Sequence, residues 1–530
     1  MNAEVKISLI VGVTGHRHLR GEDEPVLRRA VREELKKLQK ACPHTPVKLL
    51  SSFAEGGDQL CAQEAKKLGI GLIGALPMDR EEFRKDFSGL ALQTFNELCD
   101  AAEELIVPPF TETAPEVPDR DFLYRQCGIY VSAHCHVLLA LWDGAKGTRS
   151  GCGSAEAVAF MTDNDYESPE FVPLHPDDGA VLHIMTPRQG AAGEAGAVTF
   201  LGNEERFRTM LAQTDDFNRQ AAKMEDKQFL PLLPEKKDAL TENMSACYAV
   251  ADDLSMKNAA HYRRIMAVLA VLETVLALSF LLYDEADVYW LLLVCGIMLV
   301  LMFACNAWAK HLKCHQRYLE YRVLAESLRV QIFLRHAGCP AEVAELMPWS
   351  QQESTSWIRK ALGVTVIGTA PAEKHDVREY WLQDQLDYHV RSQKKTSAQL
   401  RKNDGIVRVA LVVTIALYLG TLGFEIFCGG LFGTPTLSPE KLEVWRRVLK
   451  IAVGTFTAAT AFAANFYGKL SLQQKLCDHI RMEKFYTLML ARLERFGQTD
   501  EFLTAYAKEE LTENGNWYAY QRDNKPDISL

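Results

Sequence analysis

Short apolar runs alternate with amphipathic stretches over residues 6–187. The runs lie at residues 7–13, 47–50, 71–76, 104–107, 136–142 and 180–185. Near-continuous apolar strands separated by helices are typical of a parallel sheet whose two faces are both covered. The pattern therefore predicts an α/β, Rossmann-like, doubly wound parallel sheet. The polar, helical character of the following residues, 200–260, predicts a connector.

The second half of the chain has a different pattern, with four apolar runs of 19 to 22 residues. They cover residues 265–283, 288–308, 406–427 and 448–466. At about 1.5 Å per helical residue, each is long enough to cross about 30 Å of hydrocarbon. Tyr and Trp flank the runs, as in the aromatic belts of membrane proteins. We therefore predict four transmembrane helices, with long core helices of a large soluble protein as the alternative.

Charges beside the first pair of spans predict its orientation. The turn at residues 284–287 contains no Lys or Arg, whereas Arg263, Arg264, Lys310 and Lys313 lie at the opposite ends. The positive-inside rule then places the N-terminal domain in the cytoplasm of a multi-pass membrane protein. Basic residues lie at both ends of the second pair, so its orientation follows from the even number of spans.

The two pairs of spans resemble one another at an offset of 159 residues. Asn306 and Lys310 end the second span in the same spacing as Asn465 and Lys469 end the fourth, and Gly338 corresponds to Gly497. The repeat predicts a duplicated two-span domain. The predicted divisions are an N-terminal domain with its connector, a first two-span domain, a linker, a second two-span domain and a tail, at residues 1–245, 246–345, 346–375, 376–500 and 501–530.

Composition excludes several classes of protein. Apolar residues make up 48 % and charged residues 24 % of the chain, which is unlike a disordered, collagen-like or disulfide-scaffold protein. The net charge of -10 argues against a general nucleic-acid coat protein, and no nucleic-acid partner is predicted. The 13 cysteines have no metal-ligand spacing and suit reduced, buried thiols.

Three predicted strands end in loops rich in glycine and hydroxyl side chains. The first loop offers Thr14, Gly15, His16 and Arg17; the second Ser51, Ser52, Glu55, Gly56, Gly57 and Asp58; the third Gly147, Thr148, Gly151, Gly153, Ser154 and Glu156. Because carboxyl ends of parallel strands meet at one edge of a sheet, these residues are predicted to form one phosphate-binding pocket. The alternative is three unrelated turns, with Asp58 acting only as a helix N-cap.

These residues resemble a known family. Val13-Thr-Gly-His-Arg17, Ser52-x-Ala-Glu-Gly-Gly-Asp58 and Gly151-x-Gly-Ser-x-Glu156 are similar to the SLOG domain, whose group includes Smf/DprA and Lonely Guy proteins. The two-span halves, with Tyr321-Arg-Val-Leu-Ala-Glu-Ser-Leu-Arg329, resemble SLATT effector domains. The resemblance implies a bacterial antiviral effector of the inner membrane. Its SLOG domain would sense a nucleotide signal made during phage infection, and its spans would permeabilise the membrane.

The Lonely Guy resemblance implies an alternative, a membrane-anchored nucleotide N-glycosidase that uses Glu156, with Glu55 as a possible second carboxylate. Glu156 follows Gly153 one residue sooner than in the Gly-Thr-x-x-Glu pattern of those enzymes. We therefore favour binding of a cyclic or ADP-ribose-type nucleotide without turnover. No cofactor and no metal are predicted.

Four polar residues within or beside the spans are candidates for lining a pore: Glu273, Glu425, Asn306 and Asn465. A charge at the bilayer centre costs about 3 kcal/mol on insertion scales, so such groups usually face water or a bundle interior. The alternative is a structural polar contact with a neighbouring helix. One protomer has too few spans for a wide pore, which predicts a homo-oligomer. A transporter is disfavoured, because its inverted repeats would differ from the parallel repeat seen here.

Overall fold

The structure is a computed structural model that describes residues 6–110, 114–145, 153–162, 179–224, 232–233, 238–286, 288–348, 355–368, 374–469 and 472–523. The chain divides into two compact units. Residues 1–254, 320–376 and 498–519 form the first, here called the sheet unit. Residues 255–319, 377–497 and 520–530 form the second, here called the hairpin unit. Each unit therefore combines segments that are distant in the sequence.

The sheet unit contains a seven-stranded sheet in the order β4-β3-β2-β1-β5-β6-β7. Its strands are β1 (Leu9–Gly15), β2 (Val47–Ser51), β3 (Gly71–Ala75), β4 (Glu104–Ile106), β5 (Val137–Trp142), β6 (Ala180–Met185) and β7 (Val198–Gly202). Neighbouring strands are parallel except β7, which pairs antiparallel with β6. The six predicted strands are confirmed. β7 was not predicted, because most of it was assigned to the polar connector.

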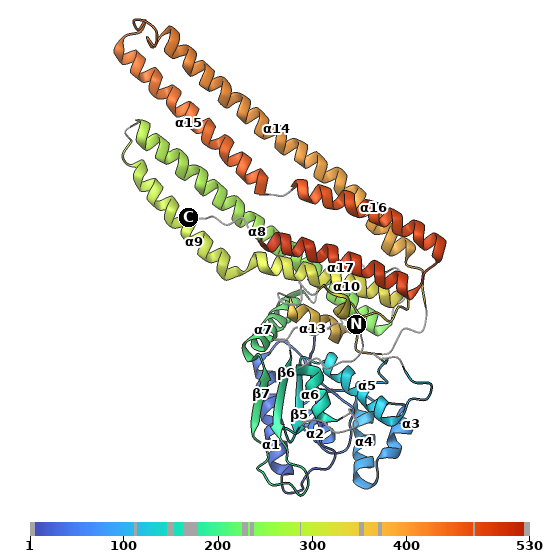
Figure 1. Cartoon of the computed structure of the whole chain (residues 1–530). Helices are drawn as coiled ribbons and strands as arrows, with labels where there is room; N and C mark the ends of the chain where they lie inside the picture. Colours follow the sequence, from blue (N-terminus) through green and yellow to red (C-terminus); the bar gives the residue numbers. More distant parts are fainter. Residues whose placement is uncertain are drawn as a thin grey trace. The chain divides into compact units, whose positions relative to one another are not determined.

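Helices cover both faces of this sheet (Figure 1). They are α1 (Glu24–Ala41), α2 (Gly57–Lys67), α3 (Arg80–Phe83), α4 (Gly89–Ala101), α5 (Arg120–Ala133), α6 (Ser154–Thr162) and α7 (Glu204–Ala221). Successive residues Leu9, Ile10 and Val11 are all buried, although neighbouring side chains of a strand point to opposite faces. Tyr130 of α5 and Met161 of α6 belong to the core on one face. The doubly wound α/β class is therefore confirmed.

Helical segments from the second half of the chain complete the sheet unit. These are the first part of α8 (Ala239–Ala286), most of α10 (Cys314–His336), α11 (Val343–Leu346), α13 (Ser356–Thr365) and most of α17 (Asp500–Asp523). The predicted linker and tail thus contain helices α13 and α17. Trp357 and Ile358 of α13 and Tyr506 of α17 are almost completely buried. Nearly every residue of α13 is buried, including Arg359 and Lys360, whereas α17 buries one face and leaves the other exposed.

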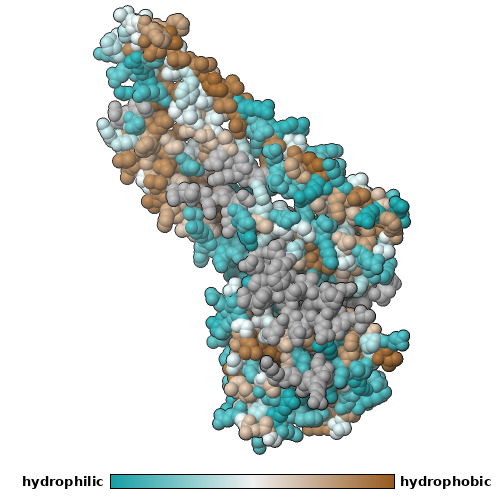
Figure 2. Space-filling view, in the orientation of Figure 1, coloured by the Kyte–Doolittle hydropathy of each residue, from teal (hydrophilic) through white to brown (hydrophobic). Residues whose placement is uncertain are grey.

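The hairpin unit contains the apolar helices. It comprises the rest of α8, α9 (Leu291–Leu312), a π-helical turn at Arg378–Gln383, α14 (Asp384–Phe427), α15 (Pro439–Lys469) and α16 (Leu472–Phe496). Among the described residues, four helices are long and apolar enough to cross a membrane, and at most 17 % of each apolar window is buried. Figure 2 shows apolar side chains exposed along them. A soluble protein would bury such surfaces, so this feature indicates a membrane protein.

The two hairpins contact each other within this unit. Ile265 and Leu269 of α8 pack with Met302 of α9 in one cluster. In the second hairpin, the hydroxyl oxygens of Thr414 and Thr460 are 2.9 Å apart. A Cβ atom added to Gly454 of α15 would lie 2.5 Å from a methyl carbon of Leu281 on α8. Glycine therefore allows α15 to approach α8 closely.

Candidate functional site

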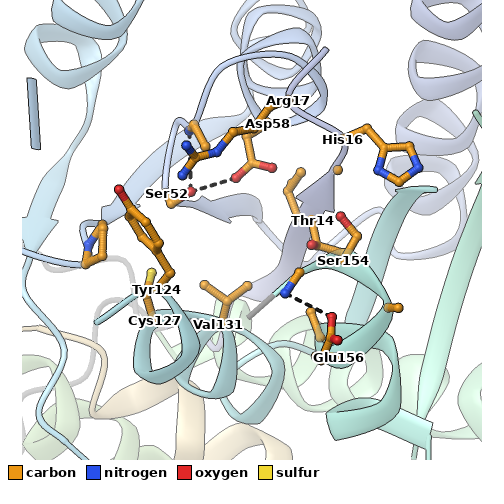
Figure 3. A pocket seen from close by; sticks show the side chains of 18 of the residues that line it. Thr14, His16, Arg17, Ser52, Asp58, Tyr124, Cys127, Val131, Ser154 and Glu156 are labelled. Atoms are coloured by element: carbon orange, nitrogen blue, oxygen red, sulfur yellow. Dashed lines mark hydrogen bonds between the residues drawn. The ribbon is translucent and has the colours of Figure 1, made fainter. Parts of the chain in front are cut away.

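A pocket of about 360 Å³ lies at the carboxyl ends of β1 and β5 (Figure 3). The strand order reverses between these two strands, which is the place where ligands bind in open α/β sheets. The loops after β1, β2 and β6, the start of α6 and one side of α5 contribute to its lining. The pocket therefore brings together parts of all three predicted loops.

Glycines allow the first two loops to approach each other. A Cβ on Gly15 would lie 2.8 Å from the Cα of Gly57, and a Cβ on Gly56 would lie 2.2 Å from the carbonyl oxygen of Arg17. Gly56 also has a φ of 90°, which side chains disfavour. The N–H of Gly57 donates to the carbonyl of His16 at 2.9 Å. These positions need glycine because a backbone, rather than a movable side chain, occupies the space.

Asp58 is a buried carboxyl group at the wall of the pocket. The hydroxyls of Ser51 and Ser52 donate to its Oδ2 at 3.0 and 2.9 Å. Burial raises the pKa of Asp58 to about 6, although both serines and the nearby Arg17 oppose the shift. Asp58 is the second residue of α2, and Gly56 occupies the N-cap position, so the expected capping role is wrong. Its carboxyl instead organises the two serines beside the pocket.

Arg17 and Tyr124 form an aromatic and cationic corner. The guanidinium carbon of Arg17 lies 4.9 Å from the centre of the Tyr124 ring. The hydroxyl of Tyr124 donates to Asp86, which fixes the ring on α5. Figure 3 shows Arg17 next to Asp58, with Tyr124 on the same side of the pocket. This corner can receive a planar ring, because a cation over an aromatic face provides stacking surfaces.

His16, Asp143 and Arg188 form a second polar group. The backbone N–H of Asp143 donates to Nε2 of His16 at 3.2 Å, and Nε of Arg188 donates to Oδ2 of Asp143 at 2.7 Å. Burial lowers the pKa of His16 by more than Asp143 raises it. The accepted hydrogen bond at Nε2 and the lowered pKa both favour a neutral imidazole. The pKa of Asp143 is also lowered, because Ala145 N–H and Arg188 outweigh its partial burial.

The N-terminus of α6 forms a further wall. Glu156 is the third residue of this helix, and its Oε2 accepts the N–H of Gly153 at 2.9 Å. This is one half of a capping box, in which the side chain satisfies an unpaired N–H at the helix start. The next N–H groups, of Ser154 and Ala155, have no intrahelical acceptor. The helix start can therefore attract an anion, while the carboxylate of Glu156 is already engaged.

The lining includes most of the predicted site residues that the structure describes. It contains Thr14, Gly15, His16, Arg17, Ser52, Asp58, Gly153, Ser154 and Glu156. Ser51, Gly56 and Gly57 support it from behind, and Glu55, although described, is not part of the lining. Gly147, Thr148 and Gly151 lie outside the described residues.

The sequence prediction missed the contributions of α5 and of the loop after β6. The residues concerned are Asp121, Tyr124, Cys127, Gly128, Val131 and Arg188, together with Pro77 and Phe83 after β3. One signal was available. Right-handed crossovers place the helix that precedes β5 beside the crevice, because β5 lies next to β1. The polar and aromatic residues at the start of that helix were therefore candidates.

The candidate pore residues have different surroundings. Arg446 donates from Nε and Nη2 to the two carboxylate oxygens of Glu425, at 2.7 and 2.6 Å. This bidentate pair joins the end of α14 to α15. It is a structural polar contact between neighbouring helices, which was the alternative to a pore-lining role. Glu273 is exposed on α8, Asn306 is half-buried, and the side chain of Asn465 lies outside the described part of the structure.

No protein-family model and no curated protein sequence matches this chain. The SLOG and SLATT resemblances therefore stay predictions from the residues quoted above. The geometry of the pocket, together with the four apolar helices, is the basis for the function proposed below.

Proposed function

We propose that this protein is a nucleotide-gated membrane effector. A cyclic or ADP-ribose-type nucleotide would bind in the pocket, and the spans would respond by opening a pore or disrupting the bilayer. The observation that carries the proposal is a pocket with charged and hydroxyl side chains in its lining, at the switch point of an α/β sheet, in a chain with four membrane-length apolar helices. Neither feature alone would distinguish an effector from a soluble enzyme or a plain membrane anchor.

The lining suits the three chemical parts of a nucleotide. The first N–H groups of α6 and the positive charge of Arg188 suit a phosphate. The Asp58 carboxylate can accept a hydrogen bond from a ribose hydroxyl, and the Arg17 guanidinium, which lies over the ring of Tyr124, offers a planar surface for a base. A volume of about 360 Å³ lies at the lower end of small-molecule pockets, which favours one compact ligand.

Glu156 gives the alternative function its basis, because it lines the same pocket. A nucleotide N-glycosidase would use this carboxylate at the bond between base and sugar. Its hydrogen bond to Gly153 N–H instead supports a role in capping the start of α6, and this favours binding without turnover. The enzyme hypothesis predicts that the protein releases free base from a nucleoside monophosphate, and that Glu156→Gln loses this activity.

The membrane part of the proposal needs more than one protomer. Glu273 lies near the middle of the predicted first span and is exposed in the single chain. An exposed carboxylate at that depth requires water or a partner, which supports assembly of several copies around a polar path. Such a path would favour cations. We place the protein in a bacterial inner membrane, with the sheet unit in the cytoplasm, and assign it to antiviral defence on the SLOG and SLATT resemblance.

Binding can be tested on the full chain in detergent. Thermal unfolding is measured with cyclic AMP, cyclic GMP, cyclic di-AMP, ADP-ribose and AMP. We expect at least one compound to raise the midpoint, and Arg188→Gln to reduce that shift. Arg208→Gln is the matched control, because Arg208 is an exposed arginine of the same unit that pairs with Glu204 outside the pocket. Equal shifts in both variants would contradict binding at this pocket.

A further inference from the structure

Helix α5 lines the pocket along most of its length, from Asp121 to Val131, and contacts another set of helices at its end. Asp121, Tyr124 and Gly128 lie in the wall of the pocket. The helix ends at Ala133, and His134 is its C-cap. A helix this short is a stiff element, so a shift at one end is carried to the other.

His134 makes a partly buried contact with Glu342, the N-cap residue of α11. Its ring stacks on Tyr130 at 4.0 Å, its Nδ1 lies 2.9 Å from the carbonyl oxygen of Tyr130, and its Nε2 lies 2.9 Å from Oε2 of Glu342. A carbonyl oxygen and a carboxylate oxygen both accept hydrogen bonds. Both ring nitrogens must therefore carry protons, and the pair is an imidazolium with a carboxylate. Glu342 accordingly raises the pKa of His134, although burial opposes it.

A second bond lies next to this ion pair. Nζ of Lys360, on α13, donates to the carbonyl of Cys135 at 2.8 Å. A small cavity of about 30 Å³ separates the end of α5 from α11 and α13, with Glu345 and Arg359 in its wall. At roughly 10–15 Å³ of such volume for each water molecule, the space holds about two, and a larger shift of α5 would break these bonds.

The contacts continue from α11 to α10. The N–H of Val343 donates to Oε1 of Gln331 at 2.7 Å, and Nε2 of Gln331 lies 3.4 Å from the carbonyl of Ala341. α10 begins directly after Lys313, which follows the apolar helix α9. A continuous series of bonds in the sheet unit therefore leads from the pocket wall to the helix that follows the second span.

We propose that α5 transmits occupancy of the pocket to α11 and α10, and that the His134–Glu342 ion pair is the bond that yields when α5 moves. The proposal rests on the function proposed above and adds its means of regulation. A ligand that needs room beside Tyr124 or Gly128 displaces α5. Tight packing allows two discrete arrangements rather than a gradual deformation, and the partly buried His134–Glu342 pair is present in only one of them.

The proposal can be tested without a ligand, by introducing a larger side chain in the pocket wall to displace α5. A Cβ added to Gly128 would lie 3.9 Å from a ring carbon of Phe160 on α6, which is an ordinary contact, so only the branched end of a leucine must push α5 away from α6. Hydrogen–deuterium exchange of residues 341–347 is measured in the full chain for Gly128→Leu, His134→Gln and the double variant. We expect each single variant to speed exchange about tenfold, because the loss of one hydrogen bond between charged groups changes an equilibrium by about this factor. The double variant should exchange no faster than His134→Gln alone.

A second pair of variants controls for general destabilisation of the sheet unit. Arg32→Gln breaks the ion pair with the buried Glu64 on α1 and α2, outside this series of contacts. Its effects and those of Gly128→Leu should be independent. If Gly128→Leu unfolds the sheet, Gly128→Val, whose branched side chain is smaller, replaces it with the same expectation. Unchanged exchange at 341–347, or additive effects with His134→Gln, would overturn the proposal. Because no nucleotide is used, a failure of nucleotide binding would leave this result standing and refute only the function proposed above.

Discussion

Asp58→Asn is the most informative single change, because it alters the dependence of stability on pH without removing the side chain. Asp58 is 5 % exposed, and burial raises its pKa from 3.8 to about 6. At about 1.4 kcal/mol for each pKa unit, this shift is worth about 3 kcal/mol. The raised pKa means that the folded state holds the proton more tightly than the unfolded state. This contribution is therefore complete below pH 3.8 and is lost as the pH rises through about 6.

Asparagine has no such proton, and its amide can still bond both serines. We therefore expect the stability of the variant, relative to wild type, to improve by about 3 kcal/mol between pH 4 and pH 7.5. The assay is hydrogen exchange of peptides from β2 and α2 in the full chain, with wild type and variant compared at each pH. Asp121→Asn, an exposed residue of the same pocket, is the control and should follow wild type. If the exchange rates of Asp58→Asn and wild type depended on pH in the same way, the reasoning would be refuted.

Three further predictions concern other parts of the molecule. Gly454→Leu should clash with Leu281 and destabilise the hairpin unit by about 1–3 kcal/mol in thermal unfolding. Adding Leu281→Ala should restore part of that loss, and a double variant that is no more stable than Gly454→Leu would count against this contact. Glu156→Ala should speed hydrogen exchange at the start of α6, at a cost of about 1 kcal/mol, whereas Glu156→Gln should not; equal effects would exclude the capping bond. In a pore, Glu273→Gln should lower the preference for cations, whereas Glu425→Gln should not, because Arg446 already pairs with that carboxylate. A loss of cation preference in Glu425→Gln but not in Glu273→Gln would contradict this assignment.

The sequence was sufficient where an unbroken apolar run marks the element. The strand at Leu9–Gly15 and the span at residues 406–427, which is the second half of α14, follow from such runs, and the lengths of the runs separate strands from spans. The strand at Val198–Gly202 was missed because it is an edge strand with exposed and half-buried residues, and it lacks such a run. Its β-branched and aromatic residues between two glycines were the available signal.

The partners of amphipathic helices could not be predicted in the same way. The pattern of α13 indicates a buried face, but it does not say that Trp357 packs near Phe217 and Tyr321. The same limit applies to the pocket. Loop glycines located its floor, because parallel strands end at one edge, whereas Tyr124 and Arg188 entered it through tertiary packing of α5 and of the loop after β6.

The central claim is that a nucleotide in the pocket controls the permeability of a membrane. The most direct measurement places the purified full chain in liposomes loaded with a self-quenched dye and adds the compound that raises its unfolding midpoint. We predict dye or ion release with that compound, a smaller release with Arg188→Gln, and none from liposomes without protein. Tight binding of the nucleotide while the liposomes stay sealed to both dye and ions would contradict the account.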